Sequence, residues 1–234
     1  MRPAYSGRGM AGACEIYVFS VAGGYMLSIP RHAISVDFFG IAGGGGGGSG
    51  RKGAAATNRG GGGGGGAAFP FFVTIPAILL PSALEIYVGK GGDGGASVSA
   101  NSTNGNAGSD GEITRMHLFY THKGIAGTGG TTSGGTGNTS TLYYNGGIVY
   151  SPGYGGGGGA ATENATMLSN SVLMCQGGGG GGGIDNTDNV GTGGGVNYST
   201  RSNLAISQGY CTQSLFADVI ATAINTNGVN GFHE

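Results

Sequence analysis

AGGGGGGSGRKGAAATNRGGGGGGGAA, residues 42–68, is the stretch that decides the fold. It holds six consecutive glycines at 43–48 and seven more at 60–66, separated by a short polar insert. Further glycine runs follow at 155–159, 177–183 and 193–195. Because the same device recurs along the chain, the glycine runs are an architectural element and not one linker.

A glycine run can be a flexible tether, or it can adopt the extended polyproline II conformation, which has three residues per turn and no hydrogen bond within its own strand. Ordering a residue's backbone costs about 1–2 kcal/mol, whereas a hydrogen bond returns a net of about 0.5–1.5 kcal/mol. One isolated run would therefore stay mobile. Several runs packed side by side can satisfy each other's amides, and we interpret this chain as such a polyglycine II lattice. The structural glycines that we expect at the ends of the runs are Gly43, Gly48, Gly60, Gly66, Gly155, Gly159, Gly177 and Gly183.

The overall composition excludes several classes of protein. Of 234 residues 58 are glycine, but there is no sustained collagen period and only six residues are proline. Charged residues make up 9% and the formal net charge is −1, so neither nucleic acid nor an anionic membrane surface is an expected partner. The 38% hydrophobic content is too high for a disordered chain and predicts a packed core.

Cofactors, metals and membrane insertion are not expected. The three cysteines, Cys14, Cys175 and Cys211, lack the spacing of a zinc site or a disulfide framework. No apolar h-region follows the N-terminus, and the longest apolar segment, residues 69–80, contains two prolines and is too short to cross a bilayer.

The pattern between the glycine runs is that of short β-strands rich in β-branched and aromatic residues. We expect about eight of them, forming an all-β sandwich or barrel, at residues 15–21, 25–29, 33–41, 69–80, 84–88, 113–121, 142–150 (a hairpin around 145–147) and 167–174. Residues 89–111 and 124–141 are rich in Gly, Asn, Ser and Thr and are expected to be loop excursions. Apolar residues at helical spacing over 215–224 predict one C-terminal α-helix. The domains expected are a glycine-rich β domain over 1–200 and a helical segment over 201–234.

Two segments carry a resemblance to a known family. Ile34-Ser35-Val36-Asp37-Phe38 runs directly into the first glycines, and Leu84 to Gly95 runs from an apolar strand into Val-Gly-Lys-Gly-Gly. In this order they resemble the glycine-rich domain of tailed-phage tail proteins, over roughly residues 15–160. The architecture is also similar to the polyglycine-helix tip adhesins of T-even-type phage fibres, whose packed glycine strands hold loops that contact a bacterial receptor. The resemblance implies a virion protein of the tail fibre or tail tip, made in the host cytoplasm.

No catalytic chemistry is expected from the motifs. A Gly-x-Gly-x-x-Gly match is trivial in this chain, no P-loop lysine follows, and there is no Gly-x-Ser-x-Gly elbow. The closest histidines, His117 and His122, are predicted on opposite faces of one strand. The stretch Asp185 to Asn189 is predicted to be a polar turn, because it lacks the glycine and distal glutamate of an EF-hand. We therefore do not expect an enzyme.

The polar loops are the candidate binding surface, since they use the Asn, Ser, Thr, Gly and Tyr vocabulary of antibody loops. Simple solvated loops are the alternative for each of them. The candidate receptor-binding residues are Asn101, Thr103, Asn104, Asn138, Tyr150, Tyr154, Asn186, Thr187, Asp188 and Tyr198.

The first functional hypothesis is a receptor-binding or fibre-tip protein whose rigid glycine core presents these loops to a host cell-surface protein or glycan. Its further expected partners are other virion tail or fibre proteins and, as one option, two more copies in a homotrimer. The second hypothesis is a structural virion component of the capsid, collar or tail. An ice-binding protein is the third, although the threonines between residues 131 and 139 lack an even repeat.

Overall fold

The computed structural model of the chain is all-β, as the strand pattern predicts, and its only helical element among the described residues is a short 3-10 helix. The described residues are 5–9, 12–68, 70–137, 143–145, 148–150, 181, 183–185, 187 and 189. The predicted strand over 167–174 and the whole C-terminal segment 201–234 with its predicted helix lie outside them.

The strands run in chain order with the 3-10 helix after β5. Their bounds are β1 Tyr5–Gly9, β2 Gly12–Ile16, β3 Gly23–Ser28, β4 Ser35–Ile41, β5 Pro70–Pro76, η1 Ala77–Leu79, β6 Ala83–Val88, β7 Thr114–Met116, β8 Phe119–Thr121, β9 Tyr143–Asn145 and β10 Ile148–Tyr150. Every pairing among these described strands is antiparallel. They form one four-stranded sheet in the order β3-β6-β7-β8 and three two-stranded sheets, β1-β2, β4-β5 and β9-β10.

The hydrophobic core lies between the four-stranded sheet and the β4-β5 pair. Phe38 of β4 packs with Leu84, Ile86 and Met116, and Leu84 is 0% exposed. Side chains alternate along these strands, so β3 and β6 each direct one face to the core and the other to solvent. Apolar residues of β5 join the same cluster, which fixes the two layers against each other.

Three of the predicted strands need correction. The strand expected over 69–80 ends at Pro76, where the 3-10 helix η1 follows. The strand expected over 113–121 is the hairpin β7-β8, because His117 takes a left-handed turn conformation with φ 51° and reverses the chain. His117 and His122 therefore do not share a strand. The strand expected over 15–21 ends at Ile16, which pairs with Tyr5 at the start of β1. The hairpin expected over 142–150 is confirmed as β9-β10.

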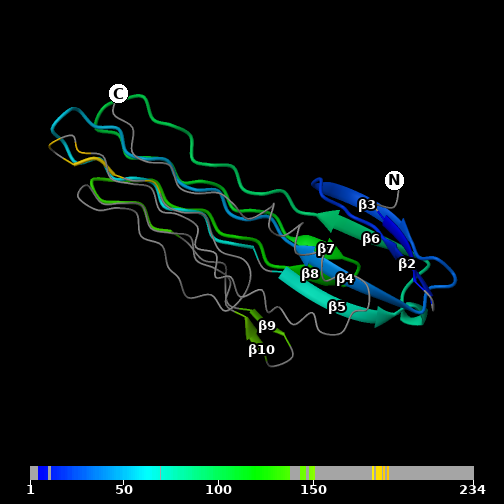
Figure 1. Ribbon diagram of the computed structural model, residues 1–234. Helices are drawn as coiled ribbons and strands as arrows, with labels where there is room; N and C mark the ends of the chain where they lie inside the picture. The colour runs from blue at the N-terminus through cyan, green and yellow to red at the C-terminus, as the bar shows by residue number, and fades with distance from the viewer. Residues whose placement is uncertain are drawn as a thin grey trace.

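Long glycine-rich segments extend from the ends of the strands, and we name them runs A to E. They are A (42–50), B (60–68), C (89–98), D (104–113) and E (123–131). Run A continues β4, C continues β6 and E follows β8, whereas B leads into β5 and D into β7. Together they form an elongated body on one side of the sheets (Figure 1). We call the sheet end of the molecule the base.

The runs are joined by lateral backbone hydrogen bonds with a three-residue period. Run A donates to run D from Gly43, Gly46 and Ser49, with N···O distances of 2.9 Å. It donates to run B from Gly45 and Gly48, and Arg51, the next residue after run A, continues the series, at 2.8–3.0 Å. Its carbonyl oxygens accept from run E at Gly43, Gly46 and Ser49 and from run C at Gly44 and Gly47. In a β-strand, residues that face the same side recur every two residues. In these runs, residues that bond the same neighbour recur every three residues.

The expectation of loop excursions over 89–111 and 124–141 is therefore wrong for most of these residues, which form runs C, D and E. Run D carries glycine at 105, 108 and 111, and run E at 124, 127 and 130. At each of these positions a Cβ atom would lie closer than 3.0 Å to a backbone atom of a neighbouring run. A Gly-x-x period is thus the sequence signal of an outer run, because only the position that meets its neighbours must lack a side chain.

Runs A and B are the central runs, and they need more glycine because they have neighbours on more sides. Residues 60–68 of run B are all buried. In run A, a Cβ on Gly43, Gly45, Gly46 or Gly48 would lie closer than 3.0 Å to a carbonyl oxygen, whereas a Cβ on Gly44 would have its nearest neighbour at 3.7 Å. Of the other glycines expected to be structural, Gly60 has the same steric need, Gly66 donates to the Ile125 carbonyl and Gly183 is buried. Gly155, Gly159 and Gly177 lie outside the described residues.

This difference predicts the outcome of two matched substitutions in one run. Gly46→Ala should lower the free energy of unfolding by about 1–3 kcal/mol, because its Cβ would overlap the Asp93 carbonyl oxygen and push runs A and C apart. Gly44→Ala adds the same methyl group at an uncrowded position and should change stability by less than about 1 kcal/mol. Urea unfolding of both variants checks this, and equal losses would contradict it.

Candidate functional site

The turns that connect the runs gather at the end of the body opposite the base (Figure 1). The insert of residues 51–59 joins run A to run B, the turn 99–103 joins C to D, and the turn 132–134 follows run E. Ile184 also lies at this end, because it forms an antiparallel bridge with Arg59 of the insert. We call this group of turns the tip.

The insert is bound to the turn at 99–103 by both backbone and side chain. Lys52 and Thr103 form an antiparallel bridge, with the Lys52 amide donating to the Thr103 carbonyl at 3.0 Å and the Thr103 amide donating back at 3.1 Å. Arg51 Nη1 donates to Asn104 Oδ1 at 3.0 Å. The insert and this turn therefore form one connected surface.

The other end of the insert is bound to the segment 183–189. The Arg59 amide donates to the Ile184 carbonyl at 2.9 Å, and the Ile184 amide donates to the Arg59 carbonyl at 2.8 Å. Ile184 is buried, so its side chain anchors the segment to the body. The insert thus connects two turns that are far apart in the sequence.

Beside Ile184, Asp185 organises a polar turn through its carboxylate. Its Oδ1 accepts from the Thr187 amide and hydroxyl and from the Asn189 amide, each at 2.8 Å. Its Oδ2 accepts from Asn189 Nδ2 at 3.1 Å. The Asn189 backbone amide and the Thr187 hydroxyl stabilise the charged form and lower the pKa of Asp185 to about 2. The polar turn predicted at this position is thus a carboxylate-centred turn.

Within the insert, short-range contacts hold the chain in place. The Thr57 hydroxyl donates to the Ala54 carbonyl at 2.6 Å, and Ala56 takes a left-handed conformation with φ 57°. A Cβ on Gly53 would lie 3.0 Å from Arg59 Cγ, which shows that the stem of Arg59 crosses over Gly53. The side chain of Arg59 is therefore directed back over the insert.

The structure brings four of the predicted receptor-binding residues to the tip. Asn101, Thr103 and Asn104 lie in or beside the turn next to the insert, and Thr187 lies in the Asp185 turn. Tyr150 belongs to β10, which lies beside the body and away from the tip (Figure 1). The remaining predicted positions, Asn138, Tyr154, Asn186, Asp188 and Tyr198, lie outside the described residues.

The sequence reasoning missed the insert itself as part of the candidate surface. Arg51, Lys52 and Arg59 are three cations within nine residues of a chain in which only 9% of residues are charged. This local concentration of positive charge is the sequence signal that could have identified the insert as part of the candidate surface. Its place at the tip depends on the pairing of runs A and B, which the sequence does not specify.

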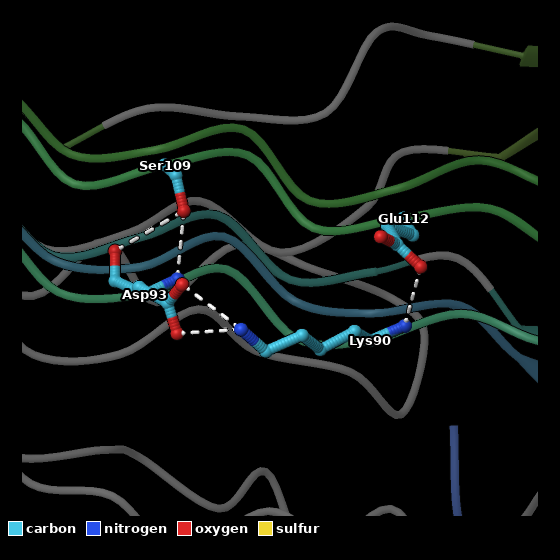
Figure 2. A network of polar contacts seen from close by, with 4 residues as sticks. All are labelled: Lys90, Asp93, Ser109 and Glu112. Atoms are coloured by element: carbon cyan, nitrogen blue, oxygen red, sulfur yellow. Dashed lines mark hydrogen bonds and ion pairs between the residues drawn. The ribbon is translucent and has the colours of Figure 1, made fainter. Parts of the chain in front are cut away.

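A second polar cluster lies on the flank of the body, along the seam between runs C and D (Figure 2). Side chains of run D accept from amides of run C: Ser109 Oγ accepts from the Asp93 amide at 2.7 Å, and Glu112 Oε2 from the Lys90 amide at 3.1 Å. Lys90 Nζ also pairs with Asp93 at 2.9 Å. These side chains satisfy amides at the edge of the body, and we assign the cluster a structural role.

Hydrogen bonds and ion pairs lower the pKa values of two carboxylates of run D, one beside run C and one beside run E. The Tyr87 hydroxyl, donating at 2.7 Å, and the Lys90 amide lower the pKa of Glu112. The Ala126 amide and Lys123 lower the pKa of Asp110. Each shift favours the ionised carboxylate, which is the form that accepts hydrogen bonds from the body's edge.

Neither metal ligands nor membrane spans are found in the part of the chain that the structure describes. No three His, Cys, Asp or Glu side chains come together there as a metal ion would require. No helix among those residues has the length and apolar character to cross a bilayer.

Comparison with known proteins gives one finding about the family. The model of a family described as a glycine-rich domain matches residues 20–210, which is most of the chain. No curated protein matches the chain.

The Asp185 turn predicts a measurable pH dependence. Because the folded pKa of about 2 lies below the ordinary value of 3.8, the turn's contribution to stability is present above about pH 4 and is lost as the pH falls through about 2. The Asn189 amide resonance should therefore shift with a midpoint near pH 2 in an NMR titration. A midpoint near 3.8 would contradict the hydrogen bonds assigned to Asp185. Asp185→Asn is the control, and it should remove the transition.

Proposed function

The chain belongs to the glycine-rich domain family, and from that premise we propose that it is a virion-associated receptor-binding protein of a phage tail fibre or tail tip. The observation that carries the proposal is the position of the tip: the described turns between the runs meet at one end of an elongated body, opposite the base (Figure 1). Such a surface can reach a host protein or glycan while the base faces the virion. The protein acts by binding and is not an enzyme in this proposal.

The body itself is proposed to be a polyglycine II lattice. Its support is the three-residue period of the hydrogen bonds of run A, because a threefold extended helix returns to the same neighbour every third residue. Further support comes from the steric need for glycine at the positions that meet neighbouring runs. A lattice of this kind holds the tip by many backbone hydrogen bonds, and the proposed C-terminal α-helix would add its apolar stripe to the core.

A purely structural virion component is the alternative, and the base supplies an observation in its favour. Ile34 and Ile78 are 88% and 91% exposed, and the Ala77 amide donates to the Ile34 carbonyl, so the two lie at the same end. Exposed apolar side chains of this kind suit a contact with another subunit. The same contact would attach a receptor-binding protein to its fibre. An experiment that changes the tip is therefore needed to distinguish the two functions.

The decisive experiment compares two matched triple variants. Asn101→Ala/Thr103→Ala/Asn104→Ala removes polar side chains from the tip, and Ser28→Ala/Thr74→Ala/Ser82→Ala removes three from the base and the exposed sheet faces. Binding of the labelled proteins to a panel of bacterial strains is measured by flow cytometry. We expect the tip variant to lose about tenfold or more in affinity for the recognised strain and the base variant to bind normally.

Both variants should keep the unfolding midpoint of the parent protein, because all six side chains are outside the core cluster. The receptor-binding proposal would be abandoned if no strain in a broad panel binds the parent protein. It would equally be abandoned if the tip variant binds as well as the parent.

A further inference from the structure

We propose that the tip recognises an acidic polysaccharide, through carboxylate or phosphate groups bound at Arg51, Lys52 and Arg59. This inference rests on the proposed receptor-binding function and names the chemical class of the receptor. It follows from the distribution of charge over the molecule, the partners of Arg51, and the neutral polar residues around the insert.

The tip and the rest of the molecule differ in charge. The described tip residues contain three cations and one carboxylate, Asp185. Asp188, which lies outside the described residues, adds a second carboxylate to the same segment of the sequence. Even with Asp188 the tip has an excess of positive charge, although the whole chain has a net charge of −1. The described residues of the body and base hold five cations and six carboxylates, so among the described residues the positive charge lies in excess only at the tip, which favours an anionic ligand there.

Three of the cations outside the tip have acidic partners. In the described body and base Lys90 pairs with Asp93, Arg115 with Glu85 and Lys123 with Asp110, at 2.9–3.0 Å. At the tip, Arg51 instead donates to the neutral amide oxygen of Asn104. Asp185 uses both carboxylate oxygens within its own turn, and no described ion pair joins it to a cation. The charge of Arg51 is thus not matched by a described carboxylate.

The chemistry of the side chains indicates the ligand. A guanidinium has five N–H donors in a planar fork, and this fork matches the two oxygens of a carboxylate or phosphate. The neutral side chains Asn101, Thr103 and Asn104 lie beside the insert and suit the hydroxyl groups of a sugar. A ligand that offers both kinds of group along a chain is an acidic polysaccharide. A neutral glycan would offer no charged group to Arg51.

The test uses three probes that separate the sources of negative charge. Polygalacturonate carries carboxylates, phosphomannan carries phosphates, and dextran is the neutral control. Binding of the full-length protein is measured by biolayer interferometry at about 20 mM and about 300 mM NaCl. We expect binding to one or both anionic probes at least about tenfold tighter than to dextran, and weaker at the higher salt concentration because salt screens exposed charges.

Two variants with the same change in net charge locate the site. Arg51→Gln/Lys52→Gln/Arg59→Gln neutralises the tip, and Lys90→Gln/Arg115→Gln/Lys123→Gln neutralises the same number of cations on the body and base. The tip variant should lose about tenfold or more of the affinity for the anionic probe, and the second variant should keep it. The salt dependence of the parent protein is a readout that requires no variant, so the proposal stays testable if a variant unfolds.

The outcomes distinguish this inference from the proposed function. If the protein binds bacterial cells through the tip but binds dextran as well as the anionic probes, the receptor-binding function stands and the acidic ligand is wrong. Equal loss in both charge variants would also overturn the inference, because binding would then follow net charge and not the tip. If no cell or probe is bound, both proposals fail.

Discussion

The structure depends on the satisfaction of backbone amides between segments that have no side chains to separate them. Each hydrogen bond contributes only about 0.5–1.5 kcal/mol net, which is comparable to the cost of ordering a single residue. The body is ordered because each central run donates to and accepts from several neighbours. Glycine is required wherever a Cβ would overlap a neighbouring carbonyl, so the composition of the runs is a steric consequence of their packing.

The sheets at the base make this packing possible, since they set where each run starts. Strands β4, β5, β6, β7 and β8 lead directly into or out of the runs, and their pairing is held by a core of ordinary hydrophobic residues around Leu84. Runs that leave adjacent strands begin side by side, which lowers the entropy cost of bringing them together. The small hydrophobic core and the glycine body are in this way parts of one cooperative arrangement.

The tip inherits its order from the body. The insert between runs A and B is bound to the turn before run D through Lys52 and to the segment 183–189 through Arg59. Polar and cationic side chains that would be mobile on free loops are thereby held on paired backbone. Pre-organisation of this kind reduces the entropy lost on binding, which suits a surface whose proposed role is recognition. The flank, in contrast, uses its polar side chains on its own edge amides (Figure 2).

The sequence by itself determined the all-β class, most strands of the base, the hairpin at 142–150 and the long glycine runs, but it did not predict β1. It also contained the Gly-x-x periods of runs D and E, which were mistaken for loops because polar residues such as Asn106 and Ser109 occupy the positions between the glycines. Only the tertiary structure decided which runs are neighbours, that His117 turns the chain, and that Lys52 meets Thr103. The physical reason is that a bare backbone offers the same donors and acceptors to every partner, so the pairing is selected by the sheets that anchor the runs and not by the glycines themselves.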